Sequence, residues 1–313
     1  MSENVKQIYE KHSKNRPLKQ VAYFLQALFG FPLIIFLRIL PVDIASYICG
    51  KTARLVGPLL KEHKVALLNL ELAFPDKSSK ELRRIALNEW ENLGRVIGEF
   101  PHISQHELFL SRMEIIGQEY ALDVLNKGNG GVFVSVHMGN WELCSLVANS
   151  LGIKLNTVYR SPNNPFFEKI FRFRTSENSG EVIPKSAHSG SRIIRIIKDK
   201  GFVGMLIDQK LREGLELKFF GKPAMTTHSP ALLAYRYGCP IIMVKIERTK
   251  GVHFKVTMYP PIYANQEEKN EENIKHLSQK LNDNIEEWIK ENPSQWLWIH
   301  KRWNQEVFSS DKK

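Results

Sequence analysis

The chain has 313 residues, of which 43% are hydrophobic and 25% are charged. These values are typical of a globular protein of one large or two small domains, and they exclude extensive disorder. Lys and Arg number 44 against 33 Asp and Glu, and the resulting net charge of +11 indicates an acidic partner: a nucleic acid, an anionic membrane surface or an acidic carrier protein. Cys49, Cys144 and Cys239 form no Cys-x-x-Cys pair, which disfavours zinc ribbons and disulfide frameworks and favours a reducing compartment.

Residues 1–20 are polar and basic, and an apolar segment follows at residues 21–40. This segment has about the length that a helix needs to cross a bilayer core, with Gly30 and Pro32 predicting a kink in its middle. Arg38 interrupts the run and no small-residue cleavage site follows, so a membrane anchor is favoured over a signal peptide, with a buried core helix as the alternative. Basic residues on both sides predict that both flanks stay in the cytoplasm, in which case the segment lies in one leaflet; its topology stays open.

Residues 41–112 are predicted to be helical. The stretch 42–60 mixes apolar and basic residues and is compatible with a helix at a membrane surface. Ser78 or Ser79 is the expected N-cap of a helix that runs through Ile97, since its apolar residues recur near helical spacing. Most of these helical residues are expected to face a core.

Strands and helices alternate in residues 113–303, which predicts an α/β fold: a mixed central sheet flanked by helices, within a larger domain at 41–313. The expected strands are 131–136, 155–159, 202–207, 241–247, 253–258 and 296–299. The expected helices are 118–126, 141–150, 165–178, 190–199, 229–237 and 270–291. The glycine-rich stretch 127–131 precedes a strand, which indicates a turn and not a phosphate-binding loop.

The strand predicted at 131–136 leads into His137-Met-Gly-Asn-Trp-Glu142. A His-x4-acid pair alone carries little weight, because ten histidines and 33 acids in 313 residues give about one such pair by chance. The chain contains a second pair, His102 and Glu107, which has no strand before it and is interpreted as a surface segment at a helix start. The first pair follows a buried strand, at the edge where open α/β sheets bind ligands.

Asn140 can cap the helix that begins at Trp141. His137 in the turn and Glu142 in the first helical turn can then face each other, whereas on one continuous helix they would lie about 140° apart. The positive end of the helix dipole would keep Glu142 ionised, and an ionised carboxylate holds an imidazole in one tautomer. We therefore predict that His137 is a general base oriented by Glu142 and acting on an acyl group; the alternative is a structural histidine at a strand end.

No Gly-x-Ser-x-Gly elbow and no His-Glu-x-x-His cluster occur in the sequence. A serine hydrolase of the usual α/β kind is therefore not expected, and neither a metal nor another cofactor is predicted. A histidine base without a nucleophilic side chain suits direct transfer to a bound hydroxyl, without a covalent acyl-enzyme.

Six short stretches carry a resemblance to a known family. They are Asn69-Leu-x-x-Ala-Phe-Pro75, His137-Met-Gly-Asn-Trp-Glu142, Tyr159-Arg-Ser-Pro-Asn-Asn-Pro165 with Arg174, Asp208-Gln209, Phe219-Phe-Gly-Lys-Pro-Ala-Met-Thr226 and Pro293-Ser-Gln-Trp-Leu-Trp-Ile-His-Lys-Arg302. In these stretches, and in their order, the chain resembles the bacterial lipid A biosynthesis acyltransferases, the late lauroyl/myristoyl type of the lysophospholipid acyltransferase-like superfamily. The ending Trp-Leu-Trp-x-His-Lys-Arg-Trp differs from the family's usual Tyr-x-Trp-x-His-Arg-Arg-Phe, which leaves the subgroup open.

The resemblance implies that residues 41–313 form an acyltransferase domain, anchored in the bacterial inner membrane and facing the cytoplasm. The donor would be an acyl thioester on acyl carrier protein, and the acceptor a hydroxyl of a lipid A precursor. Arg174 matches an important arginine of the family and is the expected partner of the oxyanion, which makes His137, Glu142 and Arg174 the expected catalytic residues.

The expected substrate-binding residues are Arg160, Asn163, Asn164, Asp208, Phe220, Gly221 and Arg302. The first three are expected to contact the head group, although Ser-Pro-Asn-Asn-Pro is also a good turn sequence. Asp208 is expected to hold a basic residue or the acceptor sugar, or else to cap a strand end. Phe220 and Gly221 are expected to shape the acyl groove or to pack in the core, and Arg302 is expected to bind phosphate. Trp296 and Trp298 are expected in the core.

Three other functions stay in view. A phospholipid-precursor acyltransferase shares the His-x4-acid logic but commonly has aspartate as the acid. An acyltransferase for another glycolipid is poorly separated by sequence. A basic peripheral protein that binds membrane or nucleic acid without catalysis is disfavoured, since the Lys and Arg residues are dispersed and no nucleic-acid motif is present; nucleic acid is therefore not an expected partner.

Overall fold

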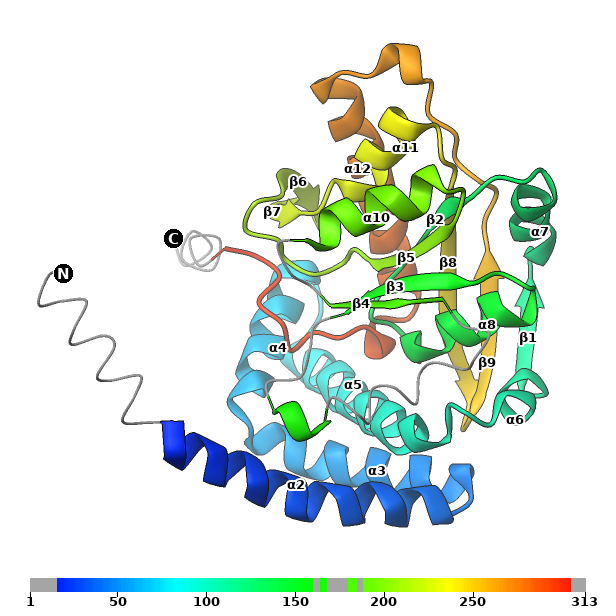
Figure 1. The fold of residues 1–313 in the computed structure, drawn as a ribbon. Helices are drawn as coiled ribbons and strands as arrows, with labels where there is room; N and C mark the ends of the chain where they lie inside the picture. The colour runs from blue at the N-terminus through cyan, green and yellow to red at the C-terminus, as the bar shows by residue number, and fades with distance from the viewer. Residues whose placement is uncertain (1–15, 160–163, 168–179, 185–187, 305–313) are drawn as a thin grey trace, which may run out of the picture.

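The computed structural model describes residues 16–159, 164–167, 180–184 and 188–304 (Figure 1). A seven-stranded sheet has the order β1-β9-β8-β2-β5-β3-β4. Its strands are β1 (Met113–Ile116), β2 (Gly131–Ser135), β3 (Leu155–Tyr159), β4 (Val182–Pro184), β5 (Phe202–Leu206), β8 (Ile241–Lys250) and β9 (His253–Met258). All neighbours are parallel except β8 and β9. The predicted mixed sheet flanked by helices is therefore confirmed.

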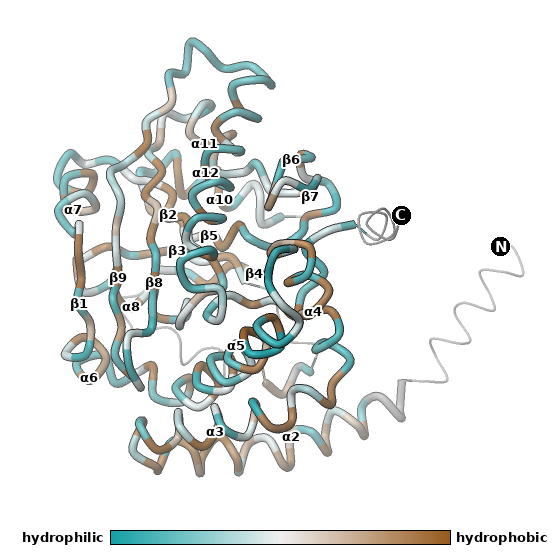
Figure 2. Tube along the Cα trace, turned by 180° about the vertical axis from the view of Figure 1, so that it is seen from behind, coloured by the Kyte–Doolittle hydropathy of each residue, from teal (hydrophilic) through white to brown (hydrophobic). Residues whose placement is uncertain are grey.

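Helices cover both faces of the sheet. They are α2 (Arg16–Ile39), α3 (Val42–Val56), α4 (Lys61–Ala73), α5 (Ser79–Glu99), α6 (His106–Leu110), α7 (Gln118–Asn126), α8 (Cys144–Ser150), α10 (Ser189–Lys198), α11 (Ser229–Tyr237) and α12 (Glu271–Glu291). Figures 1 and 2 show α2 and α3 along one end of the molecule, with α11 and α12 at the opposite end. A separate hairpin consists of β6 (Leu215–Phe219) and β7 (Lys222–Thr226).

β2 lies in the middle of the sheet and is buried along its whole length. Val132 and Val134 contribute to a core cluster with α4, α5, α11 and α12, whereas Phe133 contributes to a second cluster with α7 and α8. Alternate side chains of one strand thus supply the two faces, which explains why the strand is apolar throughout.

Several predicted boundaries agree with the structure. The helices at 118–126 and 229–237 and the strands at 155–159 and 253–258 match residue for residue. Ser78 is the N-cap of α5, where its hydroxyl and the Glu81 carboxylate form a capping box. Of the helix predicted at 165–178, only residues 165–167 are described, as a 3-10 turn, and the rest lies outside the described residues.

The strand predicted at 296–299 is wrong. Trp296 and Trp298 are buried as expected, but the segment has no regular secondary structure and makes only one isolated bridge, between Met138 and Trp296. Its alternating tryptophans imitate a strand because both rings fill one core. The short strands β1 and β4 and the hairpin β6–β7 escaped prediction, since three to five residues give little periodic signal.

α2 runs unbroken from Arg16 to Ile39 with Pro32 inside it. Its residues 20–39 are long and apolar enough to cross a membrane, and only 11% of that window is buried. This exposure contradicts the alternative of a buried core helix. Figure 2 shows the hydrophobic residues recurring along α2 and α3 at the end of the molecule.

Candidate active site

His137 and Asp208 lie side by side because β2 and β5 are parallel and in register. Ser135 pairs with Leu206, so the residues two positions further along each strand leave the same edge of the sheet together. His137 Nδ1 lies 2.8 Å from Asp208 Oδ1, and the backbone N–H of His137 donates to Asp208 Oδ2 at 2.9 Å. The imidazole is 18% exposed and the carboxylate 1% exposed. The imidazole is therefore accessible to solvent, whereas the carboxylate behind it is buried.

The Asp208 carboxylate remains ionised in this setting. Burial alone would raise its pKa, but the charge of His137 and the hydrogen bonds from His137 and Trp296 outweigh burial and lower the pKa below its usual value. Trp296 Nε1 donates to Asp208 Oδ2 at 2.7 Å. An ionised acceptor at Nδ1 holds the proton there and leaves the Nε2 lone pair available as a base. The side-chain amide of Gln209 lies 3.3 Å from Nε2.

Asp208 makes the direct hydrogen bond to the imidazole, and the orienting role of Glu142 stays a prediction. Glu142 accepts a hydrogen bond from Trp141 Nε1 at 3.0 Å, and the Trp141 ring packs edge-on against His137 with 5.2 Å between centroids. The predicted cap is confirmed: Asn140 Oδ1 accepts from the N–H of Glu142, although the helix opens with a 3-10 turn.

A buried polar network holds the turn after His137. Asn140 Nδ2 donates to Glu99 Oε2 at 2.7 Å, and the same carboxylate is paired with Arg248. The Arg248 Nε–H donates to Asn92, whose amide donates to the carbonyl of Gly139. Gly139 has φ of +59°, and a Cβ there would lie 2.2 Å from the carbonyl of Ile246, so only glycine fits the turn.

The C-terminal segment closes the other side of the site. The N–H of Leu297 donates to the carbonyl of His137 at 3.1 Å. Glu89 Oε1 accepts from the N–H of Trp298, and Asn69 donates to the carbonyls of Trp298 and His300. The ring of His300 lies 6.4 Å from that of His137. Burial raises the pKa of Glu89 to about 8, so this acid is neutral in the folded protein at neutral pH.

Three of the predicted residues, Arg160, Asn163 and Arg174, lie outside the described residues. Asn164 is buried, and its amide donates to the carbonyl of Tyr23 and to the side chain of Gln26, both on α2. Its side-chain oxygen accepts from the N–H of Phe166. The first two bonds attach the segment to α2, and the contact with a head group stays a prediction.

Phe220 and Gly221 form the two-residue turn of the β6–β7 hairpin. Their φ values are +50° and +71°, the pair of positive values that tight hairpins require, and glycine suits the second position. The Phe220 ring packs against Phe74, Trp298 and Trp303. These contacts favour packing and turn formation over the acyl groove.

The expectation that Arg302 binds phosphate is not supported by its position. Its guanidinium is buried and donates to the carbonyl of Met225, to Thr226 Oγ1 and to Asn282. It also lies over the ring of Phe219. Burial lowers its pKa to about 10, against the opposing charge of Asp208. Arg302 thus joins the C-terminal segment to β7 and α12.

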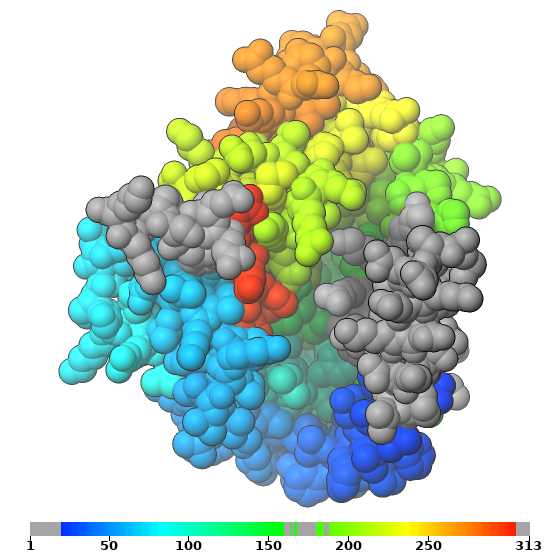
Figure 3. All heavy atoms as spheres, turned by 90° about the vertical axis from the view of Figure 1, so that its left-hand side faces the viewer, coloured from blue at the N-terminus to red at the C-terminus, as the bar shows by residue number. Residues whose placement is uncertain are grey.

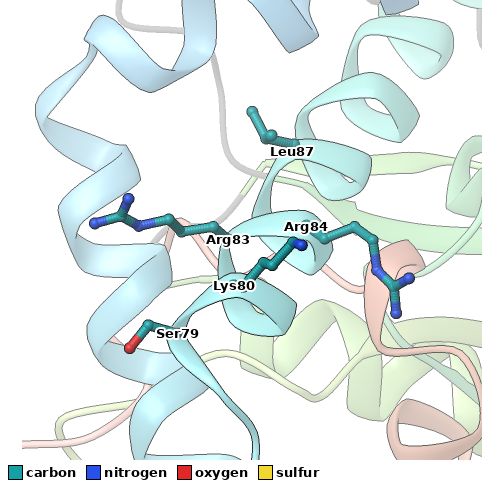
Figure 4. Close-up of a pocket in the computed structure, with 5 residues that line it drawn as sticks. All are labelled: Ser79, Lys80, Arg83, Arg84 and Leu87. Carbon is teal, nitrogen blue, oxygen red and sulfur yellow. The ribbon is translucent and has the colours of Figure 1, made fainter.

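One face of the molecule is hollowed beside these elements. In Figure 3 the hollow lies between the blue N-terminal helices, the red C-terminal segment and the yellow-green β6–β7 hairpin. A separate surface hollow of about 430 Å³ is lined by Ser79, Lys80, Arg83, Arg84 and Leu87 of α5. Figure 4 shows Arg83 and Arg84 pointing in opposite directions there, so the cations form a broad basic face and not a convergent site.

At the carboxyl edge of this mostly parallel sheet, an accessible histidine is hydrogen-bonded to a buried carboxylate, an arrangement suited to acid–base chemistry. The family model "Bacterial lipid A biosynthesis acyltransferase" matches residues 11–305, and the chain belongs to this family. It is therefore an acyltransferase of lipid A or related glycolipid biosynthesis.

Characterised relatives are distant. The chain is 23% identical over 262 residues to the lipid A biosynthesis lauroyltransferase of Escherichia coli K12, covering 81% of this chain and 83% of that one. It is 23% identical over 274 residues to the E. coli lipid A biosynthesis palmitoleoyltransferase, covering 84% and 86%. The phosphatidylinositol mannoside acyltransferase of Mycobacterium tuberculosis H37Rv is 23% identical over 234 residues, covering 72% and 71%.

Proposed function

We propose that this enzyme moves a fatty acyl chain from a thioester on acyl carrier protein to a hydroxyl of a lipid A precursor at the cytoplasmic face of the inner membrane. The observation that carries the proposal is the His137–Asp208 pair, with its ionised carboxylate and accessible imidazole. The family match and the similarity to lauroyl and palmitoleoyl transferases support the substrate class.

In the proposed mechanism, His137 Nε2 takes the proton of the acceptor hydroxyl while Asp208 stabilises the imidazolium that forms. The alkoxide adds to the thioester carbonyl and gives a tetrahedral oxyanion. The carbon–sulfur bond then breaks, and the leaving thiolate takes the proton back from Nε2. No covalent acyl-enzyme forms. Arg174 is the proposed partner of the oxyanion.

Glu142 keeps a supporting part in this proposal. Its carboxylate accepts from the Trp141 indole, which packs against the imidazole, so it contributes to the position of the ring. The basic face on α5, together with the net charge of +11, supports an acidic donor protein. Both the Glu142 carboxylate and the basic face agree with the proposed reaction, but neither makes or breaks a bond in it.

Mass spectrometry of lipid A from cells with and without the protein tests the acceptor. We expect the loss of one acyl mass in its absence, restored by the parent chain and not by His137→Ala. An unchanged profile would contradict the lipid A acceptor. Purified His137→Ala protein that transfers acyl groups from a thioester as fast as the parent would contradict the mechanism.

A second candidate acceptor is another glycolipid. The mycobacterial phosphatidylinositol mannoside acyltransferase is as similar in identity as the lipid A enzymes. The same experiment separates the two acceptors. If the acceptor is another glycolipid, cells without the protein lose one acyl mass from that glycolipid, while their lipid A stays unchanged. Family membership sets aside the non-enzymatic alternative.

A further inference from the structure

Exposed apolar side chains gather at one end of the molecule. Of the 21 large hydrophobic residues exposed in the described ranges, nine lie on α2, five on α3 and two directly after α3. The seven on α3 and directly after it are Ile44, Tyr47, Ile48, Leu55, Val56, Leu59 and Leu60. A single spanning helix would account for the first nine but not for these seven. A patch of this size on a monomer marks an interaction surface.

The inner face of α3 is already occupied by α5, so its outer face is the one left over. A Cβ on Gly94 of α5 would lie 2.3 Å from the carbonyl of Cys49, and one on Gly98 would lie 2.5 Å from the carbonyl of Ala45. The two helix backbones therefore touch and hold α3 rigidly on the domain. Ile44, Ile48 and Leu55 recur along the opposite face at helical spacing.

α2 is attached to the same domain at three points along its length. The contacts are Asn164 with Tyr23 and Gln26, Phe167 with Gly30, and His102 with Leu37. His102 Nε2 lies 2.8 Å from the Leu37 carbonyl, a buried contact, so the segment predicted to lie at the surface is a holding point for α2. From Tyr23 to Leu37 a helix covers about 21 Å, most of a bilayer core of about 30 Å. A helix held over that length cannot cross the bilayer and leave the domain outside it.

We propose that α2, α3 and residues 57–60 form one lipid-binding surface and that the chain is monotopic, with α2 lying in a single leaflet. The occupant of the surface is the acyl region of the leaflet. Arg38 at the end of α2 and Lys61 after α3 are exposed basic residues that suit anionic head groups.

This surface is joined to the active site by a short chain of hydrogen bonds. Ser46, on the inner face of α3, donates to Glu99 at 2.7 Å, and Glu99 accepts from Asn140 in the turn after His137. The hollow in Figure 3 is bordered by the same blue helices. The proposed lipid-binding surface therefore borders the hollow.

The topology is tested on the full chain with one epitope tag at each terminus, by adding protease to spheroplasts and to inverted membrane vesicles. A monotopic chain keeps both tags in spheroplasts and loses both in inverted vesicles. Loss of only one tag in spheroplasts would show that α2 crosses the membrane and would overturn the proposal. The outcome does not depend on acyl transfer, so it stands apart from the proposed reaction.

The part played by α3 is tested by binding to phosphatidylethanolamine–phosphatidylglycerol vesicles. We expect Ile48→Glu, Leu55→Glu and Leu59→Glu, combined, to lower the partition coefficient at least tenfold. The matched control, Leu68→Glu, Ile116→Glu and Tyr263→Glu, changes three exposed apolar residues elsewhere and should bind as the parent does. Equal binding of both variants would restrict the surface to α2.

A measurement that adds no charge guards against misfolding of the combined variant. In a Cys49→Ala, Cys144→Ala background, a polarity-sensitive dye on Leu59→Cys should shift to the blue when vesicles are added, whereas the same dye on Tyr263→Cys should not. Equal spectra for the two positions would place residue 59 in water and contradict the proposal.

Discussion

The imidazole of His137 is oriented by a carboxylate that lies 71 positions later in the chain. No short sequence motif predicts a hydrogen-bonded pair of residues that lie so far apart in the chain. The apolar run, the histidine and the Gly-Asn turn could be predicted from neighbouring residues, and they pointed to the correct edge of the sheet. The partner depends on the register of β2 against β5, which sequence spacing does not reveal. The helix-start geometry favours Glu142 as the partner, whereas the structure places Asp208 in hydrogen-bond contact with the imidazole.

Replacement of Asp208 by Asn tests this assignment. The amide keeps the shape but lacks the charge that stabilises the imidazolium, so kcat should fall on the order of 10³-fold with KM little changed. Trp296→Phe, which removes only one hydrogen bond to the carboxylate, should cost far less. Steady-state kinetics on both variants and on Glu142→Gln decide the matter: a large loss in Glu142→Gln alone would return the orienting role to Glu142.

Arg302 shows a limit of residue-by-residue prediction. A charged side chain near a family motif suggested phosphate, yet it lies in the core and bonds to β7 and α12. Arg248 and Glu99 are similar: each is an ordinary surface residue type, and the pair is buried under the active-site turn. Burial of a charge becomes visible only when its partner from another element is known.

At the scale of elements, α5 connects the N-terminal helices to the residues around His137. Its Glu89 and Asn92 hold the C-terminal segment and the turn after His137, while its glycines admit α3. The helix itself was predictable from its cap and periodicity. Its polar contacts with residues around position 298 were not, because they bridge 209 positions.

Glu89 gives α5 a pH-dependent contribution to stability. Its pKa is about 8 in the folded protein against an ordinary 4.5. The unfolded chain therefore releases this proton first as pH rises, and the free energy of unfolding should fall between pH 4.5 and 8, by roughly 4 kcal/mol at most. Glu89→Gln imitates the neutral acid and should flatten this slope.

Chemical unfolding in detergent at pH 5, 6, 7 and 8 measures the effect. Glu89→Gln and the parent should be about equally stable at pH 5, with the variant more stable at pH 8. Glu89→Ala serves as the control, since it loses the acceptor for Trp298 and should be less stable than Glu89→Gln at every pH. Parallel curves for the parent and Glu89→Gln would show that Glu89 does not titrate in this range.

At the scale of the whole molecule, some basic residues form ion pairs with described acidic residues and others do not. Lys80, Arg83 and Arg84 make no ion pair with any described residue, and they surround the hollow on α5. In the proposed reaction they would form the contact face for the acidic donor protein. The sequence predicts the acidic partner from net charge, and the spacing of these residues at i, i+3 and i+4 of α5 already places them close together on the helix.

Charge reversal at Lys80, Arg83 and Arg84 should raise KM for the carrier-bound thioester at least tenfold with kcat unchanged, because it weakens encounter and not chemistry. KM for a small soluble thioester should stay the same. Lys269→Glu with Lys275→Glu, at exposed positions before and on α12, is the control. Identical KM values in all variants would place the donor elsewhere.

The three attachments of α2 have a practical consequence: the anchor is not a detachable module. Deletion of the first 39 residues would leave the amide of Asn164, the ring of Phe167 and the imidazole of His102 without the surface they now cover. It would also leave the apolar face of α3 in place. A truncated chain would lose the apolar helix α2 but would expose the apolar surface that α2 now covers. A soluble form of the enzyme is therefore better sought by redesigning α3 than by deleting α2.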